Sequence, residues 1–352
     1  MSKKPKLTII TTTYNQEKYI KQCLDGIVMQ KTSFPFQAII SDDYSTDGTR
    51  KILKEYQKKY PEIIVPIFRE KNLGAMDNFI ETVNEADTEY VAFCDGDDFW
   101  TDPNKIQKQL EFLENNKDYS ICFHQTKIFF EDGSRESDIF PTYIKETTNF
   151  EDLIKECFIP ANTVMYRWMF TKKNSFKKEF PKNVVPGDYF VHLCHAQNGK
   201  IKLIKEVMSN YRRHAEGMWW LTSDNNMQEE FHLKYGVKYL NFFKAVEKRF
   251  SLPKKDFIEQ KKYLAYQTTK AYLKHKKWDE LSSLVDDNEE LIDKLFQPVN
   301  VDSVYANLSK PKKLLYLLIV DKKQILGRIE NKLEKVPFLF KIYKFFKRDK
   351  KK

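Results

Sequence analysis

Glycine is scarce in this sequence of 352 residues, and its ten glycines are widely scattered. No two of them lie two residues apart, so the G-x-G-x-x-G fingerprint of dinucleotide-binding proteins cannot occur, and the phosphate-binding G-x-x-x-x-G-K-[ST] loop is also missing. These glycine-rich loops are therefore excluded, and any phosphate group that the protein binds must be held in another way.

Cysteine is also sparse, and its pattern excludes two classes of small scaffold. The five cysteines are odd in number and widely spaced, and they form no C-x-x-C pair: Cys23, Cys94, Cys122, Cys157 and Cys194. This argues against a disulfide framework and against a structural zinc site. The pattern is typical of a protein that folds in a reducing cytosol.

Long apolar runs are missing as well. The longest uninterrupted run spans residues 314–320, whereas a membrane-spanning helix needs about 20 apolar residues. The N-terminal sequence MSKKPKLTII has basic residues but neither a sizeable apolar region nor a small-residue cleavage site. We therefore expect it to lead into a strand rather than to act as a secretory signal, which predicts a cytoplasmic protein.

The net charge of +10 is concentrated at one end of the chain. Residues 310–352 contain 15 basic and four acidic residues, a net charge of +11, so the other 309 residues carry a net charge of −1. This distribution argues against a catalytic body that binds nucleic acid. It favours a local anionic partner of the tail, such as a membrane surface.

Short β-branched runs alternate with amphipathic stretches through the first two thirds of the chain. Strands are expected at residues 6–13, 36–41, 63–68, 90–94, 120–130 and 201–206. Helices are expected at residues 17–29, 49–60, 78–86, 104–115 and 188–197, the first of them capped by Asn15. This alternation predicts an α/β fold with a mostly parallel sheet that helices cover on both faces.

Polar side chains come directly after three of the expected strands. Tyr14 follows the first strand, Asp42 and Asp43 follow the second, and Asp95 and Asp97 follow the fourth. The carboxyl ends of parallel strands open onto one crevice. We therefore expect these groups, which are distant in the sequence, to meet in a single cleft.

The tetrapeptide Asp95-Gly96-Asp97-Asp98 is the most informative of these segments. Three carboxylates within four residues repel one another unless a cation compensates. Mg²⁺ or Mn²⁺, which bind through one or two carboxylates plus substrate phosphates, fit this need, and such an ion would neutralise a departing diphosphate. The alternative is an acidic turn that caps the next helix.

Six segments stand in a fixed order along residues 6–220. They are TTTYN (11–15), SDDYSTDGT (41–49), EKNLGAMDN (70–78), FCDGDDFW (93–100), GDYFVHLCHAQNGKI (187–201) and YRRHAEGMW (211–219). In this order they resemble family 2 glycosyltransferases of the GT-A fold, of the type that builds bacterial surface glycans. The resemblance implies a Rossmann-like sheet and transfer of a sugar, with inversion, from a nucleotide diphosphate donor.

The resemblance also implies where the donor binds. Tyr14, with Thr12 beside it, matches the aromatic residue that packs on the base of the donor. Asp43 matches the carboxylate that accepts a hydrogen bond from uracil. Asn72 belongs to an N-x-G loop near the base, and Asp95 would contact the ribose.

The metal and the diphosphate are assigned in the same way. Asp97 would ligate the metal, with Asp98 as the alternative ligand. In relatives the loop around His214 closes over the donor, so His214 would complete the metal shell or touch the diphosphate. Arg212 and Arg213 suit the diphosphate because a guanidinium group binds phosphate oxygens in a bidentate manner. The alternative is a basic surface loop.

Asp188 matches the catalytic base of the family. An inverting transfer needs one carboxylate to take the proton of the acceptor hydroxyl as its oxygen attacks the anomeric carbon. The same residue could instead cap the helix that follows it. Two departures from the family stand out. Asp77 replaces a frequent arginine, which leaves the contacts to the donor phosphates and the identity of the donor base undetermined, and Gly187 replaces a glutamate.

Two further groups have competing interpretations. Trp219 and Trp220 could form an acceptor platform, since sugars stack on indole faces, or they could pack in the core. His192, Cys194 and His195 could bind zinc, but residue 194 shares no helix face with the other two and no fourth ligand is evident. For this second group we predict core packing.

After residue 227 the pattern changes to helices rich in Lys, Glu, Tyr and Leu. We expect a catalytic domain at 1–227, a helical C-terminal region at 228–309 and a basic amphipathic tail at 310–352. In the tail, aromatic residues alternate with lysines, which is typical of an interfacial helix drawn to anionic lipid. The alternative is a solubilising, disordered terminus.

The sequence thus predicts an inverting hexosyl- or N-acetylhexosaminyltransferase that is peripheral at the inner face of the cell membrane. It would use a UDP-sugar with Mn²⁺ or Mg²⁺, act on a saccharide or lipid-linked acceptor in cell-surface glycan biosynthesis, and bind no nucleic acid. A sugar nucleotidyltransferase is the first alternative, although TTTYNQEK lacks the Gly-rich basic loop of that class. A non-catalytic membrane-docked adaptor is the second, and the intact acidic residues argue against it.

Overall fold

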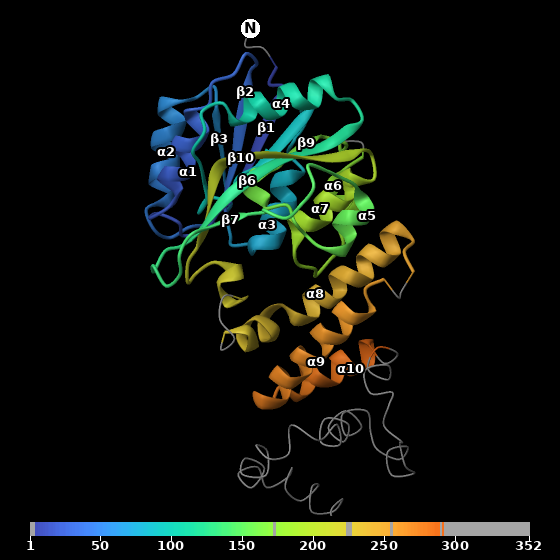
Figure 1. Cartoon of the computed structure of the whole chain (residues 1–352). Helices are drawn as coiled ribbons and strands as arrows, with labels where there is room; N and C mark the ends of the chain where they lie inside the picture. The colour runs from blue at the N-terminus through green and yellow to red at the C-terminus, as the bar shows by residue number, and fades with distance from the viewer. Residues whose placement is uncertain (1–3, 172–173, 223–226, 254–255, 289–290, 292–352) are drawn as a thin grey trace, which may run out of the picture. The chain divides into compact units, whose positions relative to one another are not determined.

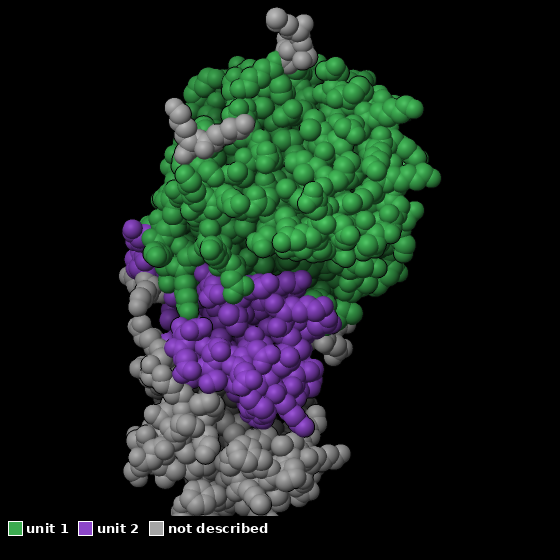
Figure 2. All heavy atoms as spheres, turned by 180° about the vertical axis from the view of Figure 1, so that it is seen from behind, with its two compact units in different colours: residues 1–227, 244–250 green, residues 228–243, 251–352 purple. Residues whose placement is uncertain are grey.

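The computed structural model describes residues 4–171, 174–222, 227–253, 256–288 and 291. The chain divides into two units, residues 1–227 with 244–250 and residues 228–243 with 251–352, which Figure 2 colours separately. The basic tail predicted at residues 310–352 lies outside the described residues.

A ten-stranded sheet forms the centre of the first unit (Figure 1), with the order β3-β2-β1-β4-β9-β6-β10-β5. These strands are β1 (Leu7–Thr13), β2 (Phe36–Asp42), β3 (Ile64–Phe68), β4 (Tyr90–Phe93), β5 (Phe99–Trp100), β6 (Tyr119–Phe130), β9 (Met165–Arg167) and β10 (Lys200–Arg213). Two short strands, β7 (Asp138–Phe140) and β8 (Thr147–Thr148), pair with β6 and β10. Neighbours among β1–β4 pair in parallel, as do β6 and β10, and β9 is antiparallel to both β4 and β6.

Helices flank this sheet, and the first of them shows why the sequence folds in this way. The helices of the first unit are α1 (Ile20–Val28), α2 (Thr49–Lys59), α3 (Ala75–Val83), α4 (Lys105–Asn115), α5 (Phe150–Lys155), α6 (Phe176–Glu179) and α7 (Gly187–Ala196), with 3₁₀ turns η1 (Ala161–Thr163) and η2 (Met218–Thr222). In α1 the residues Ile20, Cys23, Leu24 and Ile27 repeat at helical spacing and are fully buried. The predicted α/β fold of GT-A type, a mostly parallel sheet flanked by helices, is confirmed.

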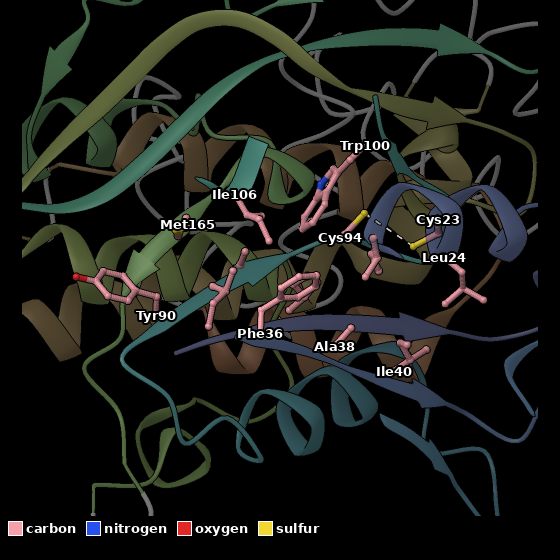
Figure 3. Packing of buried hydrophobic residues seen from close by; sticks show 14 of the residues in the cluster. Cys23, Leu24, Phe36, Ala38, Ile40, Tyr90, Cys94, Trp100, Ile106 and Met165 are labelled. Carbon is pink, nitrogen blue, oxygen red and sulfur yellow. Dashed lines mark hydrogen bonds between the residues drawn. The ribbon is translucent and has the colours of Figure 1, made fainter. Parts of the chain in front are cut away.

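Alternation along the central strands divides the core between the two faces of the sheet. Leu7 and Ile9 of β1 belong to the cluster that α1 and α4 cover, part of which Figure 3 shows. In the same cluster the Sγ atoms of Cys23 and Cys94 lie 3.8 Å apart. Ile10 points to the opposite face, where it pairs in register with Phe93 of β4. That second face leads to the candidate site.

The predicted helix cap at Asn15 is wrong. Helix α1 begins at Ile20, and Asn15 has a left-handed backbone with φ of 51°. Its side-chain oxygen accepts a hydrogen bond from the backbone N–H of Thr46 at 2.8 Å. Asparagine tolerates this conformation better than most residues, so Asn15 joins the loop after β1 to the loop after β2 instead of capping a helix.

Strand β10 is longer than the segment predicted at 201–206. The exposed pair Lys205 and Glu206 resembles a strand end in the sequence, but shifts in register between Ile204 and Val207 let the strand continue. Strand β10 therefore runs to Arg213 and delivers His214 to the carboxyl end of the sheet. Strand β9 was missed altogether because three residues carry too little periodicity.

The described part of the second unit is helical. It contains residues 228–243 of α8 (Gln228–Phe250), α9 (Ile258–Lys274) and α10 (Trp278–Asp287). Leu281, Leu284 and Val285 form the buried face of α10, which packs on α9. Among the residues that the structure describes, no helix combines the length and the apolar character needed to cross a bilayer.

Candidate functional site

The loops that follow β1, β2 and β4 meet at the carboxyl end of the sheet. The backbone N–H of Asp43 donates to the carbonyl of Thr13 at 2.9 Å, and that of Gly96 donates to the carbonyl of Thr12 at 3.1 Å. These loops line a cavity of about 730 Å³ in the first unit. The predicted site residues that line it are Thr12, Tyr14, Asp43, Asn72, Asp95, Asp97, Asp188, Arg212, Arg213, His214, Trp219 and Trp220.

Asp95 and Asp97 face this cavity together with Asp188, which comes from a distant part of the chain. Burial, helped by the negative charges of Asp97 and Asp188, raises the pKa of Asp95 to about 7. The hydroxyl of Thr12 lies 3.5 Å from the carboxylate of Asp95. A cavity that concentrates carboxylates in this way favours a cation.

Asp98 does not line the cavity, so its position does not fit the predicted role as a metal ligand. Its side chain is 2% exposed, and Oδ1 accepts a hydrogen bond from the backbone N–H of Arg212 at 2.8 Å. Burial and the charges of Asp97 and Asp95 raise the pKa of Asp98 well above its usual range. Asp98 thus fastens the acidic loop to β10.

Asp188 lies in the first turn of α7, half-buried at the wall of the cavity. It does not cap the helix, because the N-cap residue is Pro186. Its Oδ1 accepts the backbone N–H of Tyr189 at 2.9 Å. Burial raises the pKa of Asp188 to about 6, so the carboxylate is a stronger base than an ordinary aspartate and is still ionised at neutral pH.

His214 lies between two carboxylates. Its Nε2 is 2.9 Å from Oδ2 of Asp97, and its Nδ1 is 2.9 Å from Oε2 of Glu216. The ring of Tyr19 packs on the imidazole at 4.7 Å between centroids. Burial opposes a charge on His214, but the hydrogen bonds to Asp97 and Glu216 outweigh it and raise its pKa.

Two side chains of the cavity could ligate a divalent cation, but they would supply only part of its coordination shell. Asp97 offers a carboxylate and His214 an imidazole nitrogen at the same point of the cavity. Within the described residues, no group of three or more His, Cys, Asp or Glu side chains could hold a metal ion. Phosphate oxygens and water would have to complete the shell, as is usual for Mg²⁺.

Arg212 is largely occupied by contacts within the protein. Its Nε donates to the carbonyl of Asp97 at 2.9 Å, and its two terminal nitrogens donate to Glu131 and Gln22. The rings of Tyr19 and Phe129 lie 4.7 and 4.8 Å from the guanidinium carbon. These contacts indicate that Arg212 holds the acidic loop in place. They leave it poorly placed for the predicted contact with the diphosphate.

Arg213 and the two tryptophans, Trp219 and Trp220, also line the cavity. Arg213 donates to the carbonyl of Trp219 and, at 3.3 Å, to the hydroxyl of Thr222. Its Nε is buried and has no hydrogen-bond partner among the described residues. Trp219 and Trp220 are half-buried at the cavity, and Trp220 packs on Phe130 at 6.0 Å. These residues keep polar and aromatic surface turned toward the cavity.

Tyr14, in the loop after β1, is 46% exposed and leaves a broad aromatic face open. Asp43 is buried, and its two oxygens accept the backbone N–H groups of Leu73 and Gly74 at 2.7 and 2.8 Å. The side chain of Asn72 also accepts from Gly74, at 2.9 Å. A carboxylate has about four acceptor positions, so Asp43 retains acceptor capacity while it shapes this loop.

Sequence reasoning missed several lining residues. Tyr19 and Glu216 hold His214, and Glu216 could have been noticed because it lies two residues further along. Met76 and Phe79 of α3 line the cavity through an apolar helix face that the sequence marks only as core. Asp77, between them, is exposed and does not line it.

The histidines of α7 belong to the core. His192 and His195 are fully buried. Nε2 of His192 lies 3.2 Å from the carbonyl of Ile159, and its Nδ1 lies 2.5 Å from the hydroxyl of Tyr166. A neutral imidazole satisfies both contacts, with Nε2 as the donor and Nδ1 as the acceptor. Burial lowers the pKa of His192 to about 3.

The fold and the site define a class: an α/β protein of GT-A type whose sheet opens onto one acidic cavity, with a separate carboxylate on a facing helix. Comparison with known proteins narrows this class to a family of similar sequences. Residues 8–175 match the family model described as glycosyl transferase family 2. This match, over just under half of the chain, agrees with the resemblance of the first four of the six segments to that family.

Among its relatives is an uncharacterized protein of Mycobacterium tuberculosis, 40% identical over 213 residues that make up 60% of each chain. The chain thus spans less than two thirds of that relative. TuaG of Bacillus subtilis, a glycosyltransferase provisionally assigned to teichuronic acid biosynthesis, is 34% identical over 46% of this chain and 62% of its own. The structure of the mannosyltransferase PcManGT from Pyrobaculum calidifontis, in complex with GDP-Man and Mn²⁺, is 14% identical, with a TM-score of 0.49 over 92% of this chain and 89% of its own.

Proposed function

We propose that this protein transfers a sugar from a UDP-sugar to a hydroxyl of a saccharide or lipid-linked acceptor, with inversion, in cell-surface glycan biosynthesis. One observation carries the proposal: Asp95 and Asp97, after β4, and Asp188, on α7, face the same cavity. The family and the relation to TuaG support the reaction class and the type of product. Residues 1–227 would form the catalytic domain, followed by a helical region at 228–309.

The donor would lie across the carboxyl end of the sheet. Tyr14 would stack on the base and Asp43 would accept its N–H, while Asp95 would bind the ribose. Asp97 and His214 would hold Mn²⁺ or Mg²⁺, which when bound neutralises negative charge on the leaving diphosphate. Arg213, which lines the same cavity, would place its positive charge beside the phosphates.

Asp188 would act as the general base. Its carboxylate takes the proton of the acceptor hydroxyl while that oxygen forms the new bond to the anomeric carbon. The bond from the anomeric carbon to the diphosphate breaks on the opposite face, and UDP leaves. The raised pKa of Asp188, about 6, supports this role because a stronger base accepts the proton more readily. Trp219 and Trp220 would offer indole faces to the acceptor.

An Asp188→Asn variant tests this assignment. Asparagine preserves the size of the side chain but cannot accept the proton, so we expect transfer to fall by about 100-fold or more. Binding of UDP with Mn²⁺, measured by calorimetry, should persist. The matched control is Asp77→Asn, an exposed aspartate that does not line the cavity. Transfer at the parental rate by Asp188→Asn would contradict the assignment.

The two alternatives are separated by other measurements. An adaptor that kept only the fold need not bind UDP and Mn²⁺, so calorimetric binding argues against it. A sugar nucleotidyltransferase would release pyrophosphate, whereas the proposed reaction releases UDP. Product analysis of a working reaction therefore decides between the two enzyme classes.

A further inference from the structure

One part of the cavity lining is apolar although Asp95, Asp97 and Asp188 face the same cavity. We call this part the apolar wall; it consists of Ile10, Met76, Phe79, Phe93, Pro186 and Gly187, all of which line the cavity. Phe93 lies two residues before Asp95, and Gly187 directly precedes Asp188. The wall therefore adjoins both the acidic loop and the base along the chain.

The residues of the apolar wall pack closely on one another. Ile10 and Phe93 pair in register on adjacent parallel strands, and each is 2% exposed. The ring of Phe79 meets that of Phe93 edge to face, with 5.5 Å between centroids. Phe79 and Met76, one turn apart on α3, both remain partly exposed. They offer the cavity apolar surface that water covers poorly.

Gly187 is the residue that makes this wall possible. A Cβ atom at this position would lie 2.6 Å from Sδ of Met76 and 3.2 Å from Cδ1 of Phe79. The side chains of α3 therefore occupy the space that a larger residue at position 187 would need. Asp77, where the resemblance often places an arginine, is exposed and outside the cavity. Neither Gly187 nor Asp77 therefore brings a charged group to this wall.

We propose that the apolar wall is a subsite for a methyl group on the donor sugar, carried by an acetamido substituent or by a 6-deoxy carbon. The inference rests on the proposed function, because the reacting sugar must lie between the diphosphate at Asp97 and the base at Asp188. A methyl group against Met76 and Phe79 gains by leaving water. A hydroxyl group in the same place loses its hydrogen bonds to water and finds no replacement on these side chains.

Matched donors test the subsite and separate the two sources of the methyl group. UDP-N-acetylglucosamine and UDP-6-deoxyglucose each differ from UDP-glucose by one substituent. With Mn²⁺ present, we expect one of them to displace bound UDP about tenfold more effectively than UDP-glucose does, a size typical of one apolar group in a fitted pocket. Equal displacement by all three donors would overturn the subsite while leaving the proposed function intact. Failure of UDP itself to bind would overturn both.

A Met76→Gln variant links the preference to the wall. Glutamine has nearly the same length as methionine but presents an amide, so the ratio of affinities between the methyl-bearing donor and UDP-glucose should fall toward one. The matched control is Met29→Gln, a half-buried methionine at the end of α1 that does not line the cavity. An unchanged ratio in Met76→Gln would contradict the assignment of the wall, and a changed ratio in Met29→Gln would show that the effect is not local.

Discussion

At the residue scale, the proposed reaction depends on one carboxylate whose surroundings make it more basic. Burial raises the pKa of Asp188 to about 6, and only the deprotonated form can take a proton from the acceptor. We therefore expect kcat/KM to decline about tenfold per pH unit below pH 6 and to level off above it. A pH profile measured alongside UDP binding checks this, because binding that declined in parallel would assign the loss to the donor site instead.

Arg212 offers a second prediction at this scale. It joins β10 to the acidic loop through the carbonyl of Asp97 and the carboxylate of Asp98, with its guanidinium between aromatic rings. Lysine keeps the charge but not the planar fork. Arg212→Lys should therefore raise the Mn²⁺ concentration needed for UDP binding, by about tenfold for a loss of about 1.4 kcal/mol.

The control for this measurement is Arg249→Lys, which alters a surface arginine paired with Glu179 away from the cavity. Its Mn²⁺ requirement should match that of the parent protein. If Arg212→Lys also behaved like the parent, Arg212 would not be positioning the acidic loop.

At the scale of elements, the close packing of helix α1 on strand β5 can be tested at Gly26. A Cβ on Gly26 would lie 2.8 Å from the carbonyl oxygen and 2.9 Å from the backbone nitrogen of Trp100. Backbone atoms cannot move aside as a flexible side chain can. We expect Gly26→Ala to lower the free energy of unfolding by about 1–3 kcal/mol, although alanine is the better helix former by about 1 kcal/mol.

Urea unfolding measures this change. Lys21→Ala on the exposed side of the same helix is the control, and it should stay within about 0.5 kcal/mol of the parent. A Gly26→Ala protein more stable than the parent would mean that α1 can move away from β5 at little cost.

Elements with strong periodicity could be predicted, and the others could not. The apolar spacing in α1 and the β-branched run in β1 determine each element by local chemistry alone. Strand β9 depends on partners more than 40 residues away in the sequence, and the continuation of β10 past Lys205 depends on its pairing with β6. Asn15 failed as a cap because its side chain found a partner in another loop, on Thr46.

At the scale of the whole molecule, the convergence of the site could be predicted because the rule that carboxyl ends of parallel strands share a crevice needs only strand positions. It placed Asp43, Asp95 and Asp97 together, and the structure adds Asp188 to the same cavity. The rule says nothing of which way a side chain turns. Asp98 points into the protein, and the side chain of Arg212 is engaged in contacts within the protein. Neither orientation follows from sequence spacing.

The basic tail at residues 310–352 leads to a prediction for the whole chain. It carries a net charge of +11 against −1 for the rest, and each basic residue near an anionic surface contributes about 1 kcal/mol. Removal of the tail should abolish sedimentation with phosphatidylserine vesicles at low salt. Neutral phosphatidylcholine vesicles should bind neither form, and truncated protein that still bound anionic vesicles would place the contact elsewhere.

The cavity is assembled from two separate stretches of chain, residues 10–97 and residues 161–220, while residues 98–160, all of them described, supply none of its lining. Under the proposed function the first stretch recognises the base and the ribose of the donor, while the second carries the catalytic base, the acceptor surface and, through Arg213 and His214, part of the diphosphate site. The exposed turn at residues 131–135 lies between them. Recombination of two related genes at that turn would produce hybrids that keep the nucleotide preference of one parent and deliver sugar to the recipient molecule of the other.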